Sequence, residues 1–217
     1  MRFADRADAG RRLAQALARY RDRDPIVLAL PRGGLPLAAE IAEALAAPLD
    51  VVLARKIGVP GQPELAMGAL AEGDDAPIVV RNEAVIRACG IDEQAFAAAT
   101  ERARAELDDA RRRLIGGRRR AAFAGRAAIL VDDGVATGAT ALAALRSIRR
   151  RGAQTLILAA PVASPEALAT LRSEVDDLVC LAAPAHFAAV SAFYDVFPQV
   201  EDEQAIAVLA RFSAGAD

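Results

Sequence analysis

The sequence predicts an α/β protein built on a parallel sheet with helices on both of its faces. Short runs of apolar β-forming residues, such as 26–30 and 127–131, lack polar alternation, which is typical of parallel strands covered on both sides. Segments with apolar residues at three- and four-residue steps stand between these runs, as amphipathic helices require. Because strand and helix alternate along most of the chain, we expect one parallel sheet with helices as the connections.

The first quarter of the chain opens with a helix. Asp5 can cap this helix, which we expect to run to about residue 20 with Leu13 and Leu17 on one face. The next predicted elements are a buried strand at 26–30, a tight loop at 31–34, a helix at 35–46 and a second strand at 49–54.

The middle of the chain interrupts the alternation. Prolines and glycines break residues 55–64, which we expect to form a loop, and 65–71 with 78–81 can form a short antiparallel pair. A long helix is predicted over 92–115, with a narrow, alanine-rich apolar stripe. Such a stripe suits packing against another helix, so we expect a homodimer.

The alternation then resumes to the end of the chain. The predicted strands lie at 127–131, 155–160 and 178–181. One predicted helix begins at residue 141, and two more lie at 165–175 and 201–212. With 217 residues, 54% of them hydrophobic, the chain can bury one sizeable core. We therefore expect a single domain over 1–217, with its core at about 25–185 and a small C-terminal hood at about 186–217.

Composition argues against several classes of partner. The net charge of −2 gives no overall attraction to polyanions, so we expect no nucleic-acid partner. No signal peptide and no apolar run long enough to cross a bilayer is visible, so we expect no membrane partner. Cys89 and Cys180 are too few for a disulfide framework, which is consistent with a reducing cytoplasm.

Residues 129–140 carry the strongest chemical signal. A buried strand is followed by Asp132 and Asp133, and then by a turn containing Gly134, Thr137, Gly138 and Thr140 that opens a helix. Unpaired N–H groups at a helix start attract anions, and glycines let the backbone approach them closely. The run therefore predicts a phosphate site, with a sugar diol or Mg²⁺ held by the two carboxylates.

Other phosphate loops fit this run less well. A Walker A loop requires Lys after its second glycine, where this chain has Ala139, and the Gly-x-Gly-x-x-Gly dinucleotide fingerprint is absent. The remaining alternative is an ordinary strand-to-helix turn in which the aspartates only form the turn and cap the helix.

The whole run resembles the PRPP (phosphoribosyl diphosphate) motif of the type I phosphoribosyltransferases: apolar residues, two acids and a Thr-Gly-x-Thr turn. The resemblance implies that Asp132 and Asp133 hold the ribose hydroxyls and contact Mg²⁺ indirectly, through those hydroxyls or water. It also implies that six residues cradle the 5′-phosphate: Val135, Ala136, Thr137, Gly138, Ala139 and Thr140.

Two cationic segments match further parts of that family's site. Arg32-Gly33-Gly34, between a strand and a helix, resembles the loop that grips pyrophosphate; the alternative is a simple turn with a solvated arginine. Arg55 and Lys56, the only lysine, begin a stretch similar to Arg-Lys-x-Gly-x-x-Pro-Gly of adenine phosphoribosyltransferases, one residue shorter before the proline. These two cations could neutralise a polyphosphate, or simply be solvated at a strand end.

The acceptor side is less defined. Ala136 stands where 6-oxopurine enzymes of the family carry Asp, so the motifs are most similar to the adenine and uracil branches. Phe187, Tyr194 and Phe197 are candidates for a base-stacking platform, with core packing as the alternative. Arginines at 111–113 and 118–120 form either a solvated helix end or a phosphate- or RNA-binding patch.

The resemblance implies a Mg²⁺-dependent cytoplasmic phosphoribosyltransferase of nucleotide salvage, which passes the phosphoribosyl group of PRPP to a small-molecule nitrogen acceptor, expected to be a nucleobase, and releases pyrophosphate. Asp132, Asp133, Arg55 and Lys56 would be its catalytic residues. The alternative is a regulator on the same fold that senses PRPP or a nucleotide and binds RNA through the basic stretch.

Overall fold

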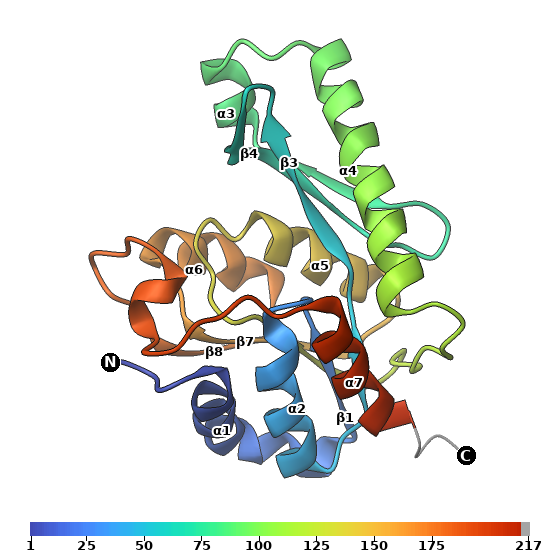
Figure 1. Ribbon diagram of the computed structural model, residues 1–217, viewed down its shortest axis with the longest axis vertical. Helices are drawn as coiled ribbons and strands as arrows, with labels where there is room; N and C mark the ends of the chain where they lie inside the picture. Colours follow the sequence, from blue (N-terminus) through green and yellow to red (C-terminus); the bar gives the residue numbers. More distant parts are fainter. Residues whose placement is uncertain (214–217) are drawn as a thin grey trace.

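The structure is a computed structural model that describes residues 1–213. Figure 1 shows a larger body around a parallel sheet and a smaller lobe, drawn in cyan and green, that stands away from it. The N-terminus and the last described helix, α7 (Asp202–Ser213), both lie on the larger body, far from the tip of the smaller lobe.

The larger body confirms the predicted parallel sheet. Five strands lie in the order β2 (Leu49–Val51), β1 (Pro25–Ala29), β6 (Ala127–Val131), β7 (Thr155–Val162) and β8 (Asp177–Ala182), and all neighbours pair in parallel. Every residue of β1 and β6 is buried, as the unbroken apolar runs require. The carboxyl ends of β1 and β6 therefore meet at the centre of one sheet edge.

Helices cover both faces of this sheet. One core cluster joins Val27, Ala29 and Ile129 to α1 (Arg6–Leu17), α2 (Gly34–Leu45) and α7 (Asp202–Ser213). The other joins Ile26, Leu28 and the alternate residues of β6 to α5 (Ala139–Arg150) and α6 (Pro165–Leu171). The period of two along each strand thus feeds two separate cores. Three short 3₁₀ helices complete this body: η1 (Ala18–Arg23), η2 (Arg172–Glu174) and η3 (Val190–Phe193).

The smaller lobe is an antiparallel sheet with two helices. Strands β3 (Ala54–Val59), β4 (Gln62–Ala71) and β5 (Ile78–Arg81) pair in that order, followed by α3 (Glu83–Ala88) and α4 (Glu93–Leu114). The predicted pairing of 65–71 with 78–81 is confirmed. The prediction of a loop over 55–64 is wrong, because these residues form a β-hairpin whose turn is Pro60-Gly61. Helix α3 was not predicted.

The predicted apolar stripe of α4 is buried within this chain. Its residues are Phe96, Ala99, Ala103, Leu107, Ala110 and Leu114. The helix packs on β3 and β4 and also contacts α7, so the stripe does not need a second copy of the chain to cover it. The expectation that it packs against another helix is met only by α7, and a homodimer stays a prediction.

The C-terminal segment packs against the N-terminus. The Phe3 N–H donates to Phe193 O at 2.9 Å, and the Asp195 N–H donates to Phe3 O at 2.8 Å. Figure 1 shows that the lobe of residues 54–114 projects from the parallel-sheet body, whereas α7 lies on that body. The hood expected at 186–217 stays a prediction, and its residues 214–217 lie outside the described residues.

No helix within residues 1–213 is long and apolar enough to cross a membrane.

Candidate functional site

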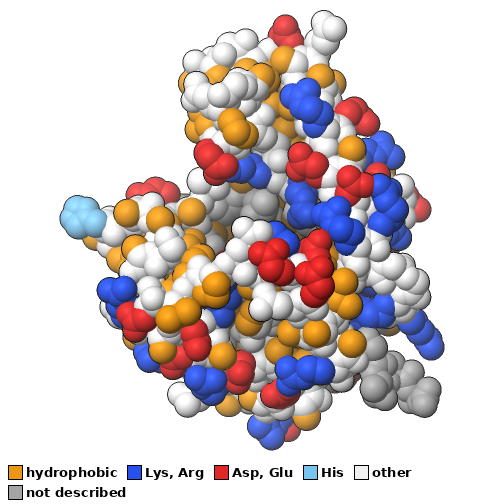
Figure 2. All heavy atoms as spheres, in the orientation of Figure 1, with side chains coloured by type: hydrophobic (Ala, Val, Ile, Leu, Met, Phe, Trp, Pro, Cys, Tyr) orange, Lys and Arg blue, Asp and Glu red, His pale blue; other side chains and the backbone are white. Residues whose placement is uncertain are grey.

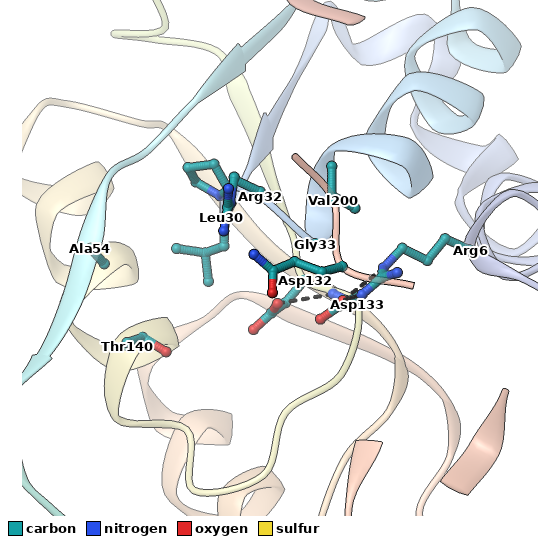
Figure 3. Close-up of a pocket in the computed structure, with 11 residues that line it drawn as sticks. Arg6, Leu30, Arg32, Gly33, Ala54, Asp132, Asp133, Thr140 and Val200 are labelled. Carbon is teal, nitrogen blue, oxygen red and sulfur yellow. Dashed lines mark hydrogen bonds and ion pairs between the residues drawn. The ribbon is translucent and has the colours of Figure 1, made fainter. Parts of the chain in front are cut away.

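The acid pair and the arginine loop come together at the carboxyl ends of β1 and β6. A cavity of about 310 Å³ lies there, and Figure 3 shows its lining. A Cβ on Gly33 would lie 2.1 Å from Asp133 Oδ2, and one on Gly34 would lie 2.5 Å from the Val131 carbonyl oxygen. Only glycine permits this approach, so the loop after β1 packs directly against the acids that follow β6. The lining residues are Arg6, Leu30, Pro31, Arg32, Gly33, Ala54, Asp132, Asp133, Thr140, Gln199 and Val200.

The two carboxylates are electrostatically distinct. Burial raises the pKa of Asp132 well above its ordinary value, and the neighbouring Asp133 charge raises it further. Burial also raises the pKa of Asp133, but the Arg6 guanidinium opposes that shift. Asp132 Oδ1 accepts the Asp133 N–H at 2.9 Å. A ligand that donates hydrogen bonds or brings a cation would relieve the repulsion in this pair.

Arg6 is a site residue that the sequence analysis did not identify. It reaches Asp133 Oδ2 from Nε at 2.9 Å and from Nη2 at 2.8 Å, as the dashed lines in Figure 3 show. Its Nη1 donates to Pro198 O at 2.6 Å, and its guanidinium carbon lies 3.7 Å from the centre of the Phe197 ring. Because Arg6 is 127 residues from Asp133 and one of many arginines, only the fold reveals the contact.

The glycine- and threonine-rich turn between β6 and α5 presents an open helix start. Gly138 has a φ of 76° and precedes the first residue of α5, and no side chain caps this helix. The N–H groups of the first turn therefore lack partners within the helix and point outward. The Val135 N–H already donates to Val162 O at 2.9 Å. Thr140 lines the first cavity, whereas Ala136 and Thr137 line a third one, so the phosphate cradle stays a prediction.

Arg32 lies on the cavity wall and is already paired. Its Nη1 is 3.2 Å from Asp202 Oδ1 and 3.7 Å from Glu201 Oε2. The second oxygen of Asp202 accepts Arg113 Nε from α4 at 2.8 Å. In Figure 2 acidic and basic side chains gather where the start of α7 lies below the end of α4.

Arg55 and Lys56 line a second cavity, of about 480 Å³, between the β3–β4 hairpin and α4. Arg55 is half-buried, and its one side-chain hydrogen bond to the described residues goes from Nη1 to the Ala54 carbonyl at 2.9 Å. Burial lowers its pKa, and Glu106 partly opposes this shift. Lys56 Nζ is paired with Glu64 Oε2 at 3.0 Å. Ala54 lines the first cavity, so β3 leads from one cavity to the other.

The three candidate aromatic residues lie apart from both of these cavities. Tyr194 is buried, with its hydroxyl donating to the Asp133 carbonyl at 2.6 Å, and its ring is 4.6 Å from that of Phe197. Phe187 lies on a third cavity with Thr137, on the outer side of the turn. Tyr194 thus contacts the acid pair and Phe197 contacts Arg6. These contacts are what the core-packing alternative for the aromatic residues describes.

The basic stretch 111–120 is largely engaged within the chain. Arg113 contacts Asp202, and Arg112 contacts Asp109. Arg118 and Arg120 meet Asp50, whose side chain is only 1% exposed, and Arg120 also meets Glu72 at 2.9 Å. Glu72 is buried as well. Four of the six arginines that favoured an RNA-binding patch are therefore paired with carboxylates of the same chain.

These features fit one family, and the comparison with known proteins agrees. The chain belongs to the phosphoribosyltransferase family: residues 3–195 match the family described as "phosphoribosyl transferase domain". The resemblance seen in the 129–140 run thus extends over nearly the whole chain.

Individual relatives support the same assignment. Two proteins of Mycobacterium tuberculosis, "Putative phosphoribosyl transferase MT0597" of strain CDC 1551 and "Putative phosphoribosyl transferase Rv0571c" of strain H37Rv, are each 46% identical over 209 residues, or 96% of this chain. The chain spans only 46% of their length. This chain is also similar to TT1426 from Thermus thermophilus, whose crystal structure is known. The two sequences are 42% identical, the TM-score is 0.81, and the alignment covers 98% of this chain and 100% of TT1426.

Proposed function

We propose that this chain transfers the 5-phosphoribosyl group of PRPP to a nitrogen acceptor, with a nucleobase as the acceptor class, and releases pyrophosphate. The observation that carries the proposal is the convergence of three ligand-binding features on one sheet edge. These are the acid pair 132–133, the open helix start at 136–140 and the arginine loop 32–34. This role fits nucleotide salvage in the cytoplasm.

The geometry supports a distinct task for each feature. Asp132 and Asp133 can accept the two ribose hydroxyls, because both carboxylates border the cavity of Figure 3. The N–H groups and hydroxyls of 136–140 can hold the 5′-phosphate at the N-terminus of α5. Arg32 lies on the opposite wall and can take the pyrophosphate, with Arg55 and Lys56 further along β3.

The donor set fits Mg²⁺ bound together with substrate. No cluster of three or more His, Cys, Asp or Glu side chains that could hold a metal occurs within residues 1–213. Mg²⁺ commonly keeps several waters and uses one or two carboxylates plus substrate oxygens. Asp132 and Asp133 would hold it through water or the PRPP hydroxyls, and the ion would supply positive charge to the pyrophosphate.

The protein would act by positioning and electrostatic stabilisation. In the proposed step the bond from C1 to pyrophosphate breaks as the bond from C1 to the acceptor nitrogen forms. The ribose centre gains positive character, which the nearby carboxylates 132–133 favour. Negative charge grows on pyrophosphate, which Arg32, Arg55 and Lys56 favour.

A test of the proposal is pyrophosphate release from PRPP and Mg²⁺ with a panel of nucleobases. We expect turnover with at least one base, reduced on the order of 10²–10³ in kcat/KM by Asp132→Asn and unchanged by Asp22→Asn, an exposed aspartate on η1. Tight PRPP binding without turnover on any base would support the alternative, a PRPP-sensing regulator on the same fold. Failure to bind PRPP would contradict both.

A further inference from the structure

An internal carboxylate occupies the cationic corner of the candidate site. Asp202, near the start of α7, bridges two arginines through different oxygens: Oδ1 is 3.2 Å from Arg32 Nη1, and Oδ2 is 2.8 Å from Arg113 Nε. Arg32 comes from the loop after β1 and Arg113 from the last turn of α4. The Asp202 carboxylate therefore links the parallel-sheet body to the smaller lobe by ion pairs, beside the proposed pyrophosphate ligand Arg32.

Arg55 is a further guanidinium, on the strand that borders the cavity. It follows Ala54, which lines the first cavity, and itself lines the second one. Arg55 is half-buried and makes no ion pair within 4 Å among the described residues. A half-buried cation without a carboxylate partner leaves N–H donors for an anion.

We propose that Asp202 stands in for a phosphate of pyrophosphate and competes with it, and that Arg113 is an additional pyrophosphate-binding residue once Asp202 is displaced. A phosphate group offers more oxygens and more charge than a carboxylate, so it can bridge the same two guanidinium groups. The inference rests on the proposed function, because it takes Arg32 as a pyrophosphate ligand.

The carboxylate is well placed to be displaced. Its side chain is 27% exposed, and that of Arg113 is 53% exposed, so solvent reaches both partners. Partly exposed ion pairs of this kind are weak, so a multiply charged ligand can outcompete them. Glu201, 3.7 Å from Arg32 and 58% exposed, adds a weaker competing charge.

The test is the affinity of each variant for inorganic pyrophosphate, measured by isothermal titration calorimetry. Asp202→Asn keeps the shape and removes the charge, so we expect the Kd to fall about threefold to tenfold. Arg113→Ala should raise the Kd by a similar factor of about three to ten. Melting temperatures of the free variants check that each is folded.

Two matched controls separate competition from a general change in charge. Glu203→Gln removes an exposed carboxylate one residue further along α7, and Arg112→Ala removes the arginine next to Arg113. Both should leave the Kd within about twofold, and the gain in Asp202→Asn should persist at about 0.5 M salt, where long-range effects are screened.

The outcomes separate this inference from the function on which it rests. If Arg32→Ala weakens pyrophosphate binding but Asp202→Asn leaves it unchanged or weakens it, the competition is refuted while the binding site stands. If Arg113→Ala binds pyrophosphate as the unmodified chain does, its role as a ligand is refuted. If the unmodified chain and Asp202→Asn both fail to bind pyrophosphate, the inference and the proposed function fail together.

Discussion

Replacing either member of the acid pair by its amide should change stability by different amounts. Asp132→Asn and Asp133→Asn each remove one negative charge and keep the shape of the side chain. No cation contacts the Asp132 carboxylate within the described residues, whereas Arg6 makes a two-nitrogen contact with Asp133. At neutral pH we expect the first variant to gain more stability than the second.

The gain in Asp132→Asn follows from its raised pKa. Burial and the Asp133 charge both disfavour the ionised form of Asp132 in the folded state. For a carboxyl with a raised pKa, stability is highest at low pH and is lost as pH rises through the folded-state value. Each unit of such a shift corresponds to about 1.4 kcal/mol, so removing the charge should add on the order of 1 kcal/mol at pH 7. The gain should vanish below about pH 3.9, where both states are protonated.

The smaller gain in Asp133→Asn follows from the partner that it loses. Burial raises the pKa of Asp133 too, but the Arg6 guanidinium opposes that shift. The side chains of Arg6 and Asp133 are only 10% and 16% exposed, so Arg6 would keep a largely buried charge without its counter-ion. We expect the gain at pH 7 to be smaller than that in Asp132→Asn.

Thermal and urea unfolding at pH 7 measure both changes. For a chain of this size, 1 kcal/mol shifts the melting temperature by about 2–4 °C. Both variants should still lose activity, by on the order of 10²–10³ in kcat/KM. Shifts of the same sign and size in the two variants would refute the assignment of Arg6 to Asp133.

Three further substitutions test other parts of the account. Gly33→Ala should weaken PRPP binding by more than about tenfold and cost about 1–3 kcal/mol, since its Cβ would meet Asp133 at 2.1 Å; wild-type binding would contradict that packing. Arg120→Ala should cost about 3 kcal/mol in urea unfolding by abandoning two buried carboxylates, whereas Arg119→Ala should stay within about 0.5 kcal/mol; similar losses would contradict the network. Lys56→Ala should weaken PRPP binding more than ribose 5-phosphate binding, and equal losses would argue against its pyrophosphate role.

The parallel sheet was predictable because its signals are local. Runs such as 26–30 and 127–131 are continuously apolar, and the cap at Asp5 lies in the sequence itself. The β3–β4 hairpin was missed because Pro60, Gly61 and Pro63 indicate a loop, although the strands on either side are held by pairing. Tertiary pairing can override such local preferences.

The ion-pair partners of the site were not predictable from sequence. The motifs pointed to Asp132, Asp133, Arg32 and the turn, and the first three line one cavity with Thr140 because parallel strands end together. Arg6 and Asp202 reach that edge from the two ends of the chain, over separations of 127 and 170 residues. Spacing in the sequence carries no signal for contacts of this kind.

A crystal structure of the chain with PRPP and Mg²⁺ tests the central claim most directly. The account predicts the 5′-phosphate on the N–H groups of residues 136–140, the ribose hydroxyls on Asp132 and Asp133, and the pyrophosphate beside Arg32. PRPP bound only between α4 and the β3–β4 hairpin, with the 136–140 turn unoccupied, would contradict it.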